Sequence, residues 1–183
     1  MKTTAKKRLT ILAGLSLALL VTLPGLLSAN ENRGRGPKMA VLSGVGGWDL
    51  VPPAFTAQFL FVDADLNTHA RHMPLVGALK LTGNGVIIDS KISADFNAEL
   101  DPTFSGPLWG EVTMTAKVGG INTLIFEGRA NGDLVGLVGA GKMKLIGRGP
   151  YLGATLDLTF VEIGPGNTDN YNWTGRLLHF PTR

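Results

Sequence analysis

The densest group of side chains that could do chemistry begins at Asp63. Asp63, Asp65 and Asn67 match the first three ligand positions of a calcium-binding loop, in which oxygens at alternate positions converge on the ion. The match ends there. Thr68 stands where the loop needs glycine, and Pro74 stands where it needs a bidentate glutamate.

Two histidines in the same segment suggest a different metal. His69 and His72, together with Asp63 or Asp65, supply imidazole and carboxylate ligands of the kind that bind zinc. The alternative is a polar loop between two strands, spanning residues 63–74. Both interpretations stay open on the sequence alone.

Patterns for catalysis and cofactors are missing elsewhere. The sequence has no G-x-S-x-G nucleophile elbow, and His179 lies in a strand-like segment at the C-terminal end. Residues 139–142 lack the spacing of a phosphate-binding loop, and residues 147–149 lead into a strand where a dinucleotide loop would open a helix. The lack of cysteine excludes disulfides, thiolate nucleophiles and cysteine-ligated metals. We predict no catalytic residue and no cofactor.

Acidic side chains alternate along one segment. Asp89, Asp95 and Glu99 share a face with lysine and serine, which is typical of a solvated exterior. The same face would line a polar lumen if it pointed into a wide barrel. Asp157, between two threonines, is open to the same two interpretations.

Aromatic residues give the other clue to binding. Phe55, Phe59 and Phe61 share a strand face with Ala57. Further rings flank or occupy the C-terminal strands, at Trp109, Tyr151, Tyr171, Trp173 and Phe180. Such rings usually fill a core, but small neighbours could leave a cavity beside them, because a barrel of about eight strands can hold one small ligand.

The elements that must position these residues are strands. From Met39 onward apolar residues alternate with period two, most clearly over residues 86–100, and again over residues 112–118 and 152–160. The pattern predicts strands near residues 39–44, 54–62, 75–83, 86–100, 107–118, 121–130, 134–146, 152–162 and 171–180.

Glycine-rich turns join the predicted strands. Residues 83–85, 119–120 and 131–132 offer the positive φ angles that tight hairpins need. Glycines inside strands are expected to mark bends or close backbone approaches, at Gly128, Gly136, Gly139, Gly141, Gly147 and Gly153. The predicted fold class is all-β, a single, mostly antiparallel β-barrel of about eight to nine strands, because closure removes exposed edges. A sandwich is the alternative.

The N-terminus has the three parts of a secretory signal peptide: a basic start, an apolar run over residues 9–21, and small residues before a cleavage site after Ala29. An uncleaved anchor is the alternative. Residues 30–38 then form a flexible arm before a domain at residues 39–183. Without residues 1–29 the chain has 13 basic and 14 acidic residues, a net charge of −1, so we expect no nucleic-acid binding. The predicted location is secreted or periplasmic, with no stable membrane span after cleavage.

A resemblance covers the C-terminal part of the chain. Residues 106–110, 126–128, 147–153 and 173–176 resemble small exported bacterial β proteins of uncharacterised function. The G-x-G-x-Y-x-G-A-T stretch over residues 147–155 is also similar to the closing hairpin of the allene oxide cyclase and dirigent barrel group. The resemblance implies a barrel of about eight strands and assigns no active-site residue.

These observations predict a non-enzymatic exported β-barrel that binds an apolar small molecule or a macromolecular partner. The candidate ligand-binding residues are Tyr151, Asp157, Arg148, Trp109 and Trp173, and the candidate metal ligands are Asp63, Asp65, His69 and His72. The alternatives are a cyclase-like or isomerase-like enzyme with a pocket in the barrel, and a surface assembly protein joined through sheet edges.

Overall fold

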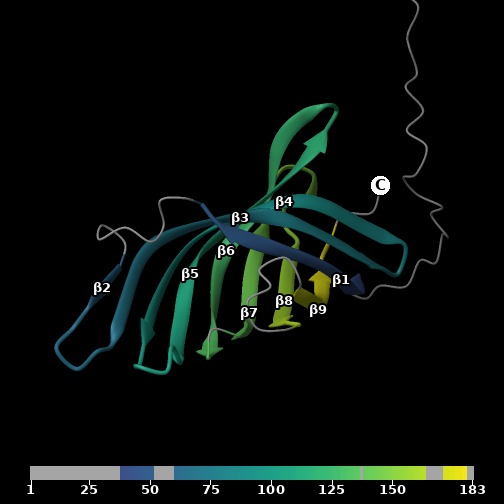
Figure 1. The fold of residues 1–183 in the computed structure, drawn as a ribbon. Coiled ribbons are helices and arrows are strands. Elements are labelled where there is room, and N and C mark those ends of the chain that lie inside the picture. The colour runs from purple at the N-terminus through teal and green to yellow at the C-terminus, as the bar shows by residue number, and fades with distance from the viewer. Residues whose placement is uncertain (1–37, 52–59, 137, 164–170, 181–183) are drawn as a thin grey trace, which may run out of the picture.

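The computed structural model describes residues 38–51, 60–136, 138–163 and 171–180. Their regular elements are β1 Met39–Leu50, β2 Leu60–Val62, β3 Thr68–Gly83, β4 Val86–Leu100, β5 Gly106–Val118, β6 Ile121–Val135, β7 Val138–Gly147, the 3-10 helix η1 Gly149–Tyr151, β8 Thr155–Glu162 and β9 Tyr171–Leu178 (Figure 1). Within these ranges no helix has the length and apolar character needed to cross a bilayer.

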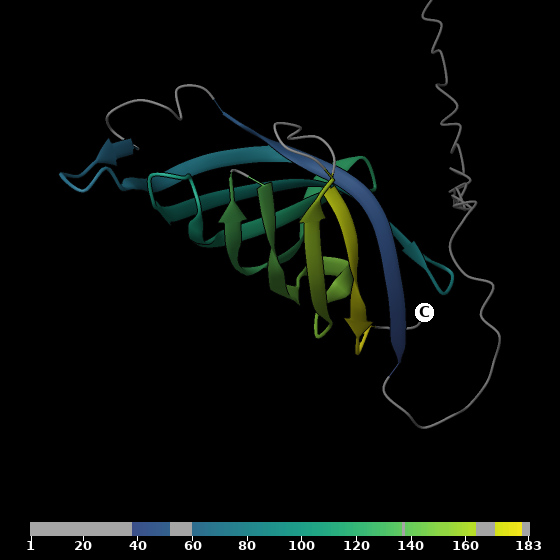
Figure 2. The ribbon, with the colours of Figure 1, turned by 60° about the horizontal axis from the view of Figure 1, so that its bottom comes forward.

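Strand β1 closes the sheet into a barrel. Strands β3 to β9 pair in chain order as antiparallel neighbours, and β1 pairs with β9 on one side and β3 on the other. Figure 2 shows β1 running beside β9. Eight strands therefore form a closed antiparallel barrel, while β2 is an additional short strand on the first residues of β3. The prediction of an all-β barrel is confirmed.

The barrel interior is apolar because side chains alternate along each strand. In β4 the side chains of Ile92 and Phe96 are buried, while those of Lys91 and Asp95 are exposed. The predicted bounds of this strand, residues 86–100, agree with the structure. The solvated-exterior interpretation of its acidic face is also confirmed, since Asp89, Asp95 and Glu99 are all exposed.

Five aromatic rings pack together in the interior. The Trp48 ring centroid lies 5.1 Å from that of Phe96, 5.4 Å from Phe160, 5.7 Å from Tyr171 and 5.5 Å from Trp173, in edge-to-face arrangements. Each such pair stabilises the fold beyond the burial of its apolar area, by roughly 1 kcal/mol. These rings belong to the barrel core.

Glycine permits the close approach of β1 and β3 where the barrel closes. A Cβ atom at Gly77 would meet the backbone carbonyl of Gly47 and the Cα atom of Trp48. The predicted role of glycine in close approaches also holds inside β6 and β7, where a side chain would meet neighbouring backbone at Gly128, Gly141 and Gly147. Gly136 and Gly153 lie in turns instead.

Several predicted boundaries are wrong, and the first strand, predicted to end near residue 44, continues to Leu50. Strand β3 begins at Thr68, not near residue 75, so residues 68–74 of the predicted polar loop belong to a strand. The turn predicted at residues 131–132 lies inside β6, paired with β5 and β7. Leu152 does not start a strand, because η1 precedes it and β8 begins at Thr155. For β3 and β6 backbone pairing with neighbouring strands overrides the local signal, and after η1 the turn bonds of Leu152 and Ala154 to Gly149 and Tyr151 do.

Several predictions fall on residues outside the described ranges. These are the signal peptide at residues 1–29, nearly all of the arm at residues 30–38, and the aromatic face built on Phe55, Ala57 and Phe59. Phe61 lies in β2, where its ring stacks on that of His69 with centroids 4.5 Å apart.

Candidate functional site

A groove of about 1160 Å³ crosses the outer face of the barrel from β4 to β9. Its floor is one row of cross-strand partners whose side chains belong to the inner face: Gly110, Ala130, Met143, Leu158 and Gly175. Three of the five have little or no side chain. We infer that the wall can therefore bow inward along this row, which hollows the outer surface.

One side of the groove is a row of ionisable residues, one from each strand, which we call the charged row. Its members are direct cross-strand neighbours: Asp95, Glu111, Arg129, Lys144, Asp157 and Arg176. The sign changes along the row, with two acids over β4 and β5 and mainly cations over β6 to β9. A ligand lying in the groove therefore meets an acidic end and a basic end.

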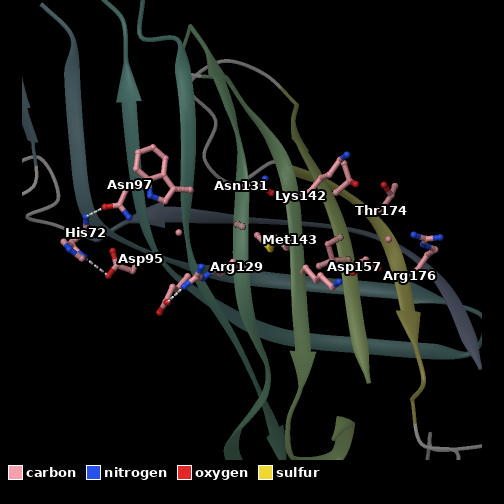
Figure 3. A pocket seen from close by; sticks show the side chains of 18 residues that line it. His72, Asp95, Asn97, Arg129, Asn131, Lys142, Met143, Asp157, Thr174 and Arg176 are labelled. Carbon is pink, nitrogen blue, oxygen red and sulfur yellow. Dashed lines mark hydrogen bonds and ion pairs between the residues drawn. The ribbon is translucent and has the colours of Figure 1, made fainter. Parts of the chain in front are cut away.

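The other side is a row of mostly uncharged residues, which we call the tryptophan row. Its members are also direct cross-strand neighbours: Asn97, Trp109, Asn131, Lys142, Thr159 and Thr174. Figure 3 shows Asn97 at one end of the groove, Thr174 at the other, and Asn131 and Lys142 between them.

Trp109 is the aromatic member of the groove, and it is 38% exposed. The guanidinium of Arg71, on β3, lies 5.5 Å from its ring centroid. Arg71 is itself fixed by hydrogen bonds from Nη1 to the Ala98 carbonyl at 3.0 Å and from Nη2 to Glu99 Oε1 at 2.6 Å. The indole is thus braced from one side.

The basic end of the groove holds side chains with unused hydrogen-bonding capacity. Within the described part of the chain, Lys142, Lys144 and Arg176 make no side-chain hydrogen bond or ion pair, and neither does Asp157. Arg129 makes one long contact, 3.9 Å from its Nη2 to Glu111 Oε1. A charged ligand could bind these groups without displacing an existing protein partner.

At the acidic end of the groove the lining side chains contact one another. His72 lies within a bulge in β3, between Ala70 and Met73, and has a positive φ of 53°. Its Nδ1 lies 3.1 Å from Asp95 Oδ2, and its backbone N–H donates to Asn97 Oδ1 at 3.2 Å (Figure 3). The bulge therefore turns His72 toward the groove and fixes two of the other lining residues.

The predicted ligand-binding residues separate into three groups. Trp109 and Asp157 line the groove. Trp173 belongs to the barrel core and is 1% exposed. Arg148 precedes η1 and Tyr151 is its last residue, and neither lines the groove.

Each of these two residues has a protein partner. Arg148 Nε donates to Glu127 Oε1 at 2.9 Å. The Tyr151 ring lies 4.8 Å from that of Phe126, and burial raises the pKa of its hydroxyl.

The four predicted metal ligands do not form one group, because Asp63 contacts His69 while His72 lies elsewhere. Asp63 accepts hydrogen bonds from the backbone N–H groups of Asp65 and Asn67 and from His69 Nε2, each at 2.9 Å. His72 contacts Asp95 instead. Among the described residues no group of three or more His, Cys, Asp or Glu is arranged to hold a metal ion. The calcium-like sequence therefore forms a turn that Asp63 holds closed.

Asp63 is held in its ionised form by this turn. The hydrogen bond from His69 is the largest cause that lowers the pKa of Asp63 to about 2. Partial burial, the second largest cause, opposes this shift, and the donors of Asn67 and Asp65 contribute to the lowering. The carboxylate is thus engaged by its own segment.

One polar cluster lies inside the barrel. The buried Glu162 accepts hydrogen bonds from the Gly139 N–H at 2.7 Å and from the Tyr171 hydroxyl at 3.4 Å. Burial is the largest cause that raises the pKa of Tyr171 to about 12. Glu162 is thus satisfied by protein donors, and the surrounding space is filled by the aromatic core.

The prediction from sequence missed most of the groove, including Asn131, Lys142, Lys144 and Arg176. A signal exists in retrospect: successive strands carry a charged residue two positions from an amide, tryptophan, lysine or threonine. Only the strand register aligns these pairs into two rows.

Comparison of the chain with protein-family models, with curated proteins and with solved structures finds no match. The resemblance to the allene oxide cyclase and dirigent barrels therefore stays a prediction.

Proposed function

We propose that the protein is an exported, non-enzymatic binding barrel that holds a macromolecular partner in its outer groove. The supporting observation is the groove itself: Trp109 braced by Arg71, beside the unpartnered Lys142, Lys144 and Arg176, on a face made by six strands. An exposed ring beside charges that no protein group uses offers a ligand both apolar area and charged hydrogen-bond partners, which favours a binding role.

The filled interior favours a partner outside the barrel over an apolar ligand inside it. Trp48 and its four aromatic neighbours occupy the space in which a small apolar ligand would lie. The cyclase-like alternative has less support, since Arg148 and Tyr151 pair with Glu127 and Phe126 instead of joining Asp157. The open groove is long enough for an extended partner.

A blocking substitution tests the groove without assuming the ligand. Thr159 is exposed in the groove as the cross-strand neighbour of Lys142, so Thr159→Trp should obstruct the groove there. Thr82 is exposed on β3, outside the groove, and Thr82→Trp is the matched control. We would measure binding of the purified protein to a panel of defined oligosaccharides, peptides and oligonucleotides by calorimetry.

The proposal expects at least one panel member that binds the wild type and Thr82→Trp alike and loses at least tenfold in affinity with Thr159→Trp. If no ligand distinguishes the two variants, the proposal fails. Export is tested separately by mass spectrometry of the protein from its native location, which should show a chain that begins at Asn30.

A further inference from the structure

We propose that the occupant of the groove is an acidic oligosaccharide, with one sugar ring on Trp109 and a carboxylate or sulfate on Lys142 and Lys144. This assignment rests on the binding role proposed above and names the class of ligand. It follows from the order of side chains across the strands.

The first step concerns Trp109 and its flanks. Its cross-strand partners in the tryptophan row are Asn97 on β4 and Asn131 on β6. An indole face suits a flat apolar surface, and an amide on each side offers both donors and acceptors. A sugar ring has this combination, with an apolar C–H face and a rim of hydroxyl groups. Because Arg71 holds the indole in place, little side-chain entropy is lost on binding.

The second step concerns the anionic group. Lys142 is the cross-strand partner of Asn131, so it lies two strands from Trp109. At a strand spacing of about 4.8 Å, the two positions are roughly 10 Å apart. Lys144 is exposed on the same strand and, like Lys142, lacks a partner in the described part of the chain. A carboxylate or sulfate one or two sugar units from the stacked ring would reach both ammonium groups.

The third step distinguishes this ligand from nucleic acid. Asp95 and Glu111 lie in the charged row beside Trp109. A polynucleotide that stacked a base on Trp109 would bring phosphates against these two carboxylates, and like charges at short range repel. An oligosaccharide whose charges are separated can place its anion at the lysines and its hydroxyl groups against the acids.

The fourth step distinguishes it from a peptide. Peptides often bind sheets by adding a strand to a free edge, where backbone groups are available. The groove crosses six strands whose backbones are paired with each other, so recognition must come from side chains. Hydroxyl-rich ligands use such side chains directly, whereas a peptide would leave its own backbone groups without protein partners.

The experiment compares five probes of matched length by calorimetry: a galacturonate oligomer, a sulfated galactan oligomer, an uncharged cellulose oligomer, a polyglutamate peptide and an oligothymidylate. Comparing the galacturonate oligomer with the sulfated galactan oligomer shows whether the site prefers a carboxylate or a sulfate. The variants are Trp109→Ala, Trp109→Phe and the double variant Lys142→Ala/Lys144→Ala. The matched control is Lys91→Ala/Lys117→Ala, which removes two exposed lysines outside the groove.

We expect one of the acidic oligosaccharides to bind at least tenfold more tightly than the uncharged one. Trp109→Ala should weaken it by about tenfold and Trp109→Phe by less, because a ring face remains. The Lys142→Ala/Lys144→Ala variant should remove the preference for the charged sugar, and higher salt should reduce it in the wild type. The control double variant should bind like the wild type.

Two results would overturn the assignment while leaving the binding role intact. One is equal affinity for the charged and uncharged sugars. The other is tighter binding of polyglutamate or oligothymidylate that Thr159→Trp still blocks. If Thr159→Trp changes the binding of no probe, both the assignment and the binding role fail.

Discussion

The Arg71 guanidinium lies over the Trp109 ring, 5.5 Å from its centroid, at the boundary between the wall of the barrel and the outer groove. Arg71 also reaches the Ala98 carbonyl and the Glu99 carboxylate on β4. One side chain of β3 therefore links the backbone of β4 to the exposed ring of β5. This contact determines how firmly the groove presents the Trp109 ring.

Removing Arg71 should loosen Trp109. Trp109 is the exposed member of three tryptophans, since Trp48 and Trp173 are buried, so it dominates quenching by acrylamide. We expect Arg71→Ala to increase the quenching constant and to lower stability by about 1 kcal/mol or less, because the pair is partly exposed. Arg129→Ala, which removes an exposed arginine on the same face, serves as the control. Equal quenching constants in the two variants would contradict the claim that Arg71 holds the Trp109 ring in place.

The two tryptophans predicted together as ligand-binding residues should behave differently. Trp173 is 1% exposed and its Nε1–H donates to the Gly46 carbonyl at 3.2 Å. Trp173→Ala should lower the free energy of unfolding by roughly 3–5 kcal/mol, as expected for a buried aromatic residue. Trp109→Ala should change it by about 1 kcal/mol or less. Urea unfolding curves measure both, and comparable losses would contradict this division of roles.

The buried Tyr171 hydroxyl should make stability fall at alkaline pH. Its pKa is raised from 10.0 to about 12, so the folded state keeps the proton at pH values where the unfolded chain has lost it. Stability should therefore be unaffected below pH 10 and decrease as the pH rises toward 12, by on the order of 2 kcal/mol. Urea unfolding at several pH values measures this.

The control for this alkaline effect is Tyr171→Phe, which removes the titrating group but keeps the ring. It should be somewhat less stable than the wild type at neutral pH, because the contacts to Glu162 and Trp48 are lost. Its stability should also fall less steeply above pH 10. Parallel curves for the two proteins would show that Tyr171 is not the group responsible.

At acidic pH the turn at Asp63 should open. The pKa of Asp63 is lowered from 3.8 to about 2, with the His69 hydrogen bond as the largest cause. The stability linked to this shift is present above about pH 4 and is lost as the pH falls toward 2. Carbon-detected NMR titration should give the low pKa in the wild type and a higher one in His69→Ala. His72→Ala should leave it unchanged, and a shift there would argue against the observed pairing.

The barrel was predictable because most strands have one apolar and one polar face. Over residues 86–100 the alternation is nearly unbroken, and the predicted and observed bounds agree. The same logic placed the turns at residues 83–85 and 119–120, where Asn84, Gly85, Gly119 and Gly120 all have positive φ.

The first part of β3 was not predictable in this way. His69, Arg71 and His72 interrupt the apolar alternation, and the bulge after Ala70 shifts the register. What holds this segment as a strand is backbone pairing with β2 and with the last residues of β4. Such long-range pairing leaves no local trace in the sequence.

The groove was largely hidden for a related reason. Asn-Gly at residues 131–132 is a strong turn signal, yet both residues pair on two sides within β6, and Asn131 lines the groove. Asp157 and Trp109 were found because a charge and a ring stand out individually. Lys142, Lys144 and Arg176 gain meaning only from the cross-strand register, which one sequence does not reveal.

The position of β1 has a consequence for how the chain folds. Its partners are β3 and β9, so Met39 pairs with Leu178 at the opposite end of the domain. The hairpins from β3 to β9 can form as the polypeptide emerges, but the ring cannot be completed until the last strand has been made. Contacts between such distant segments slow folding, because loop closure must come first. We therefore expect closure of the barrel to be slow and to follow synthesis of the chain, because β1 can pair with β9 only after β9 has been made.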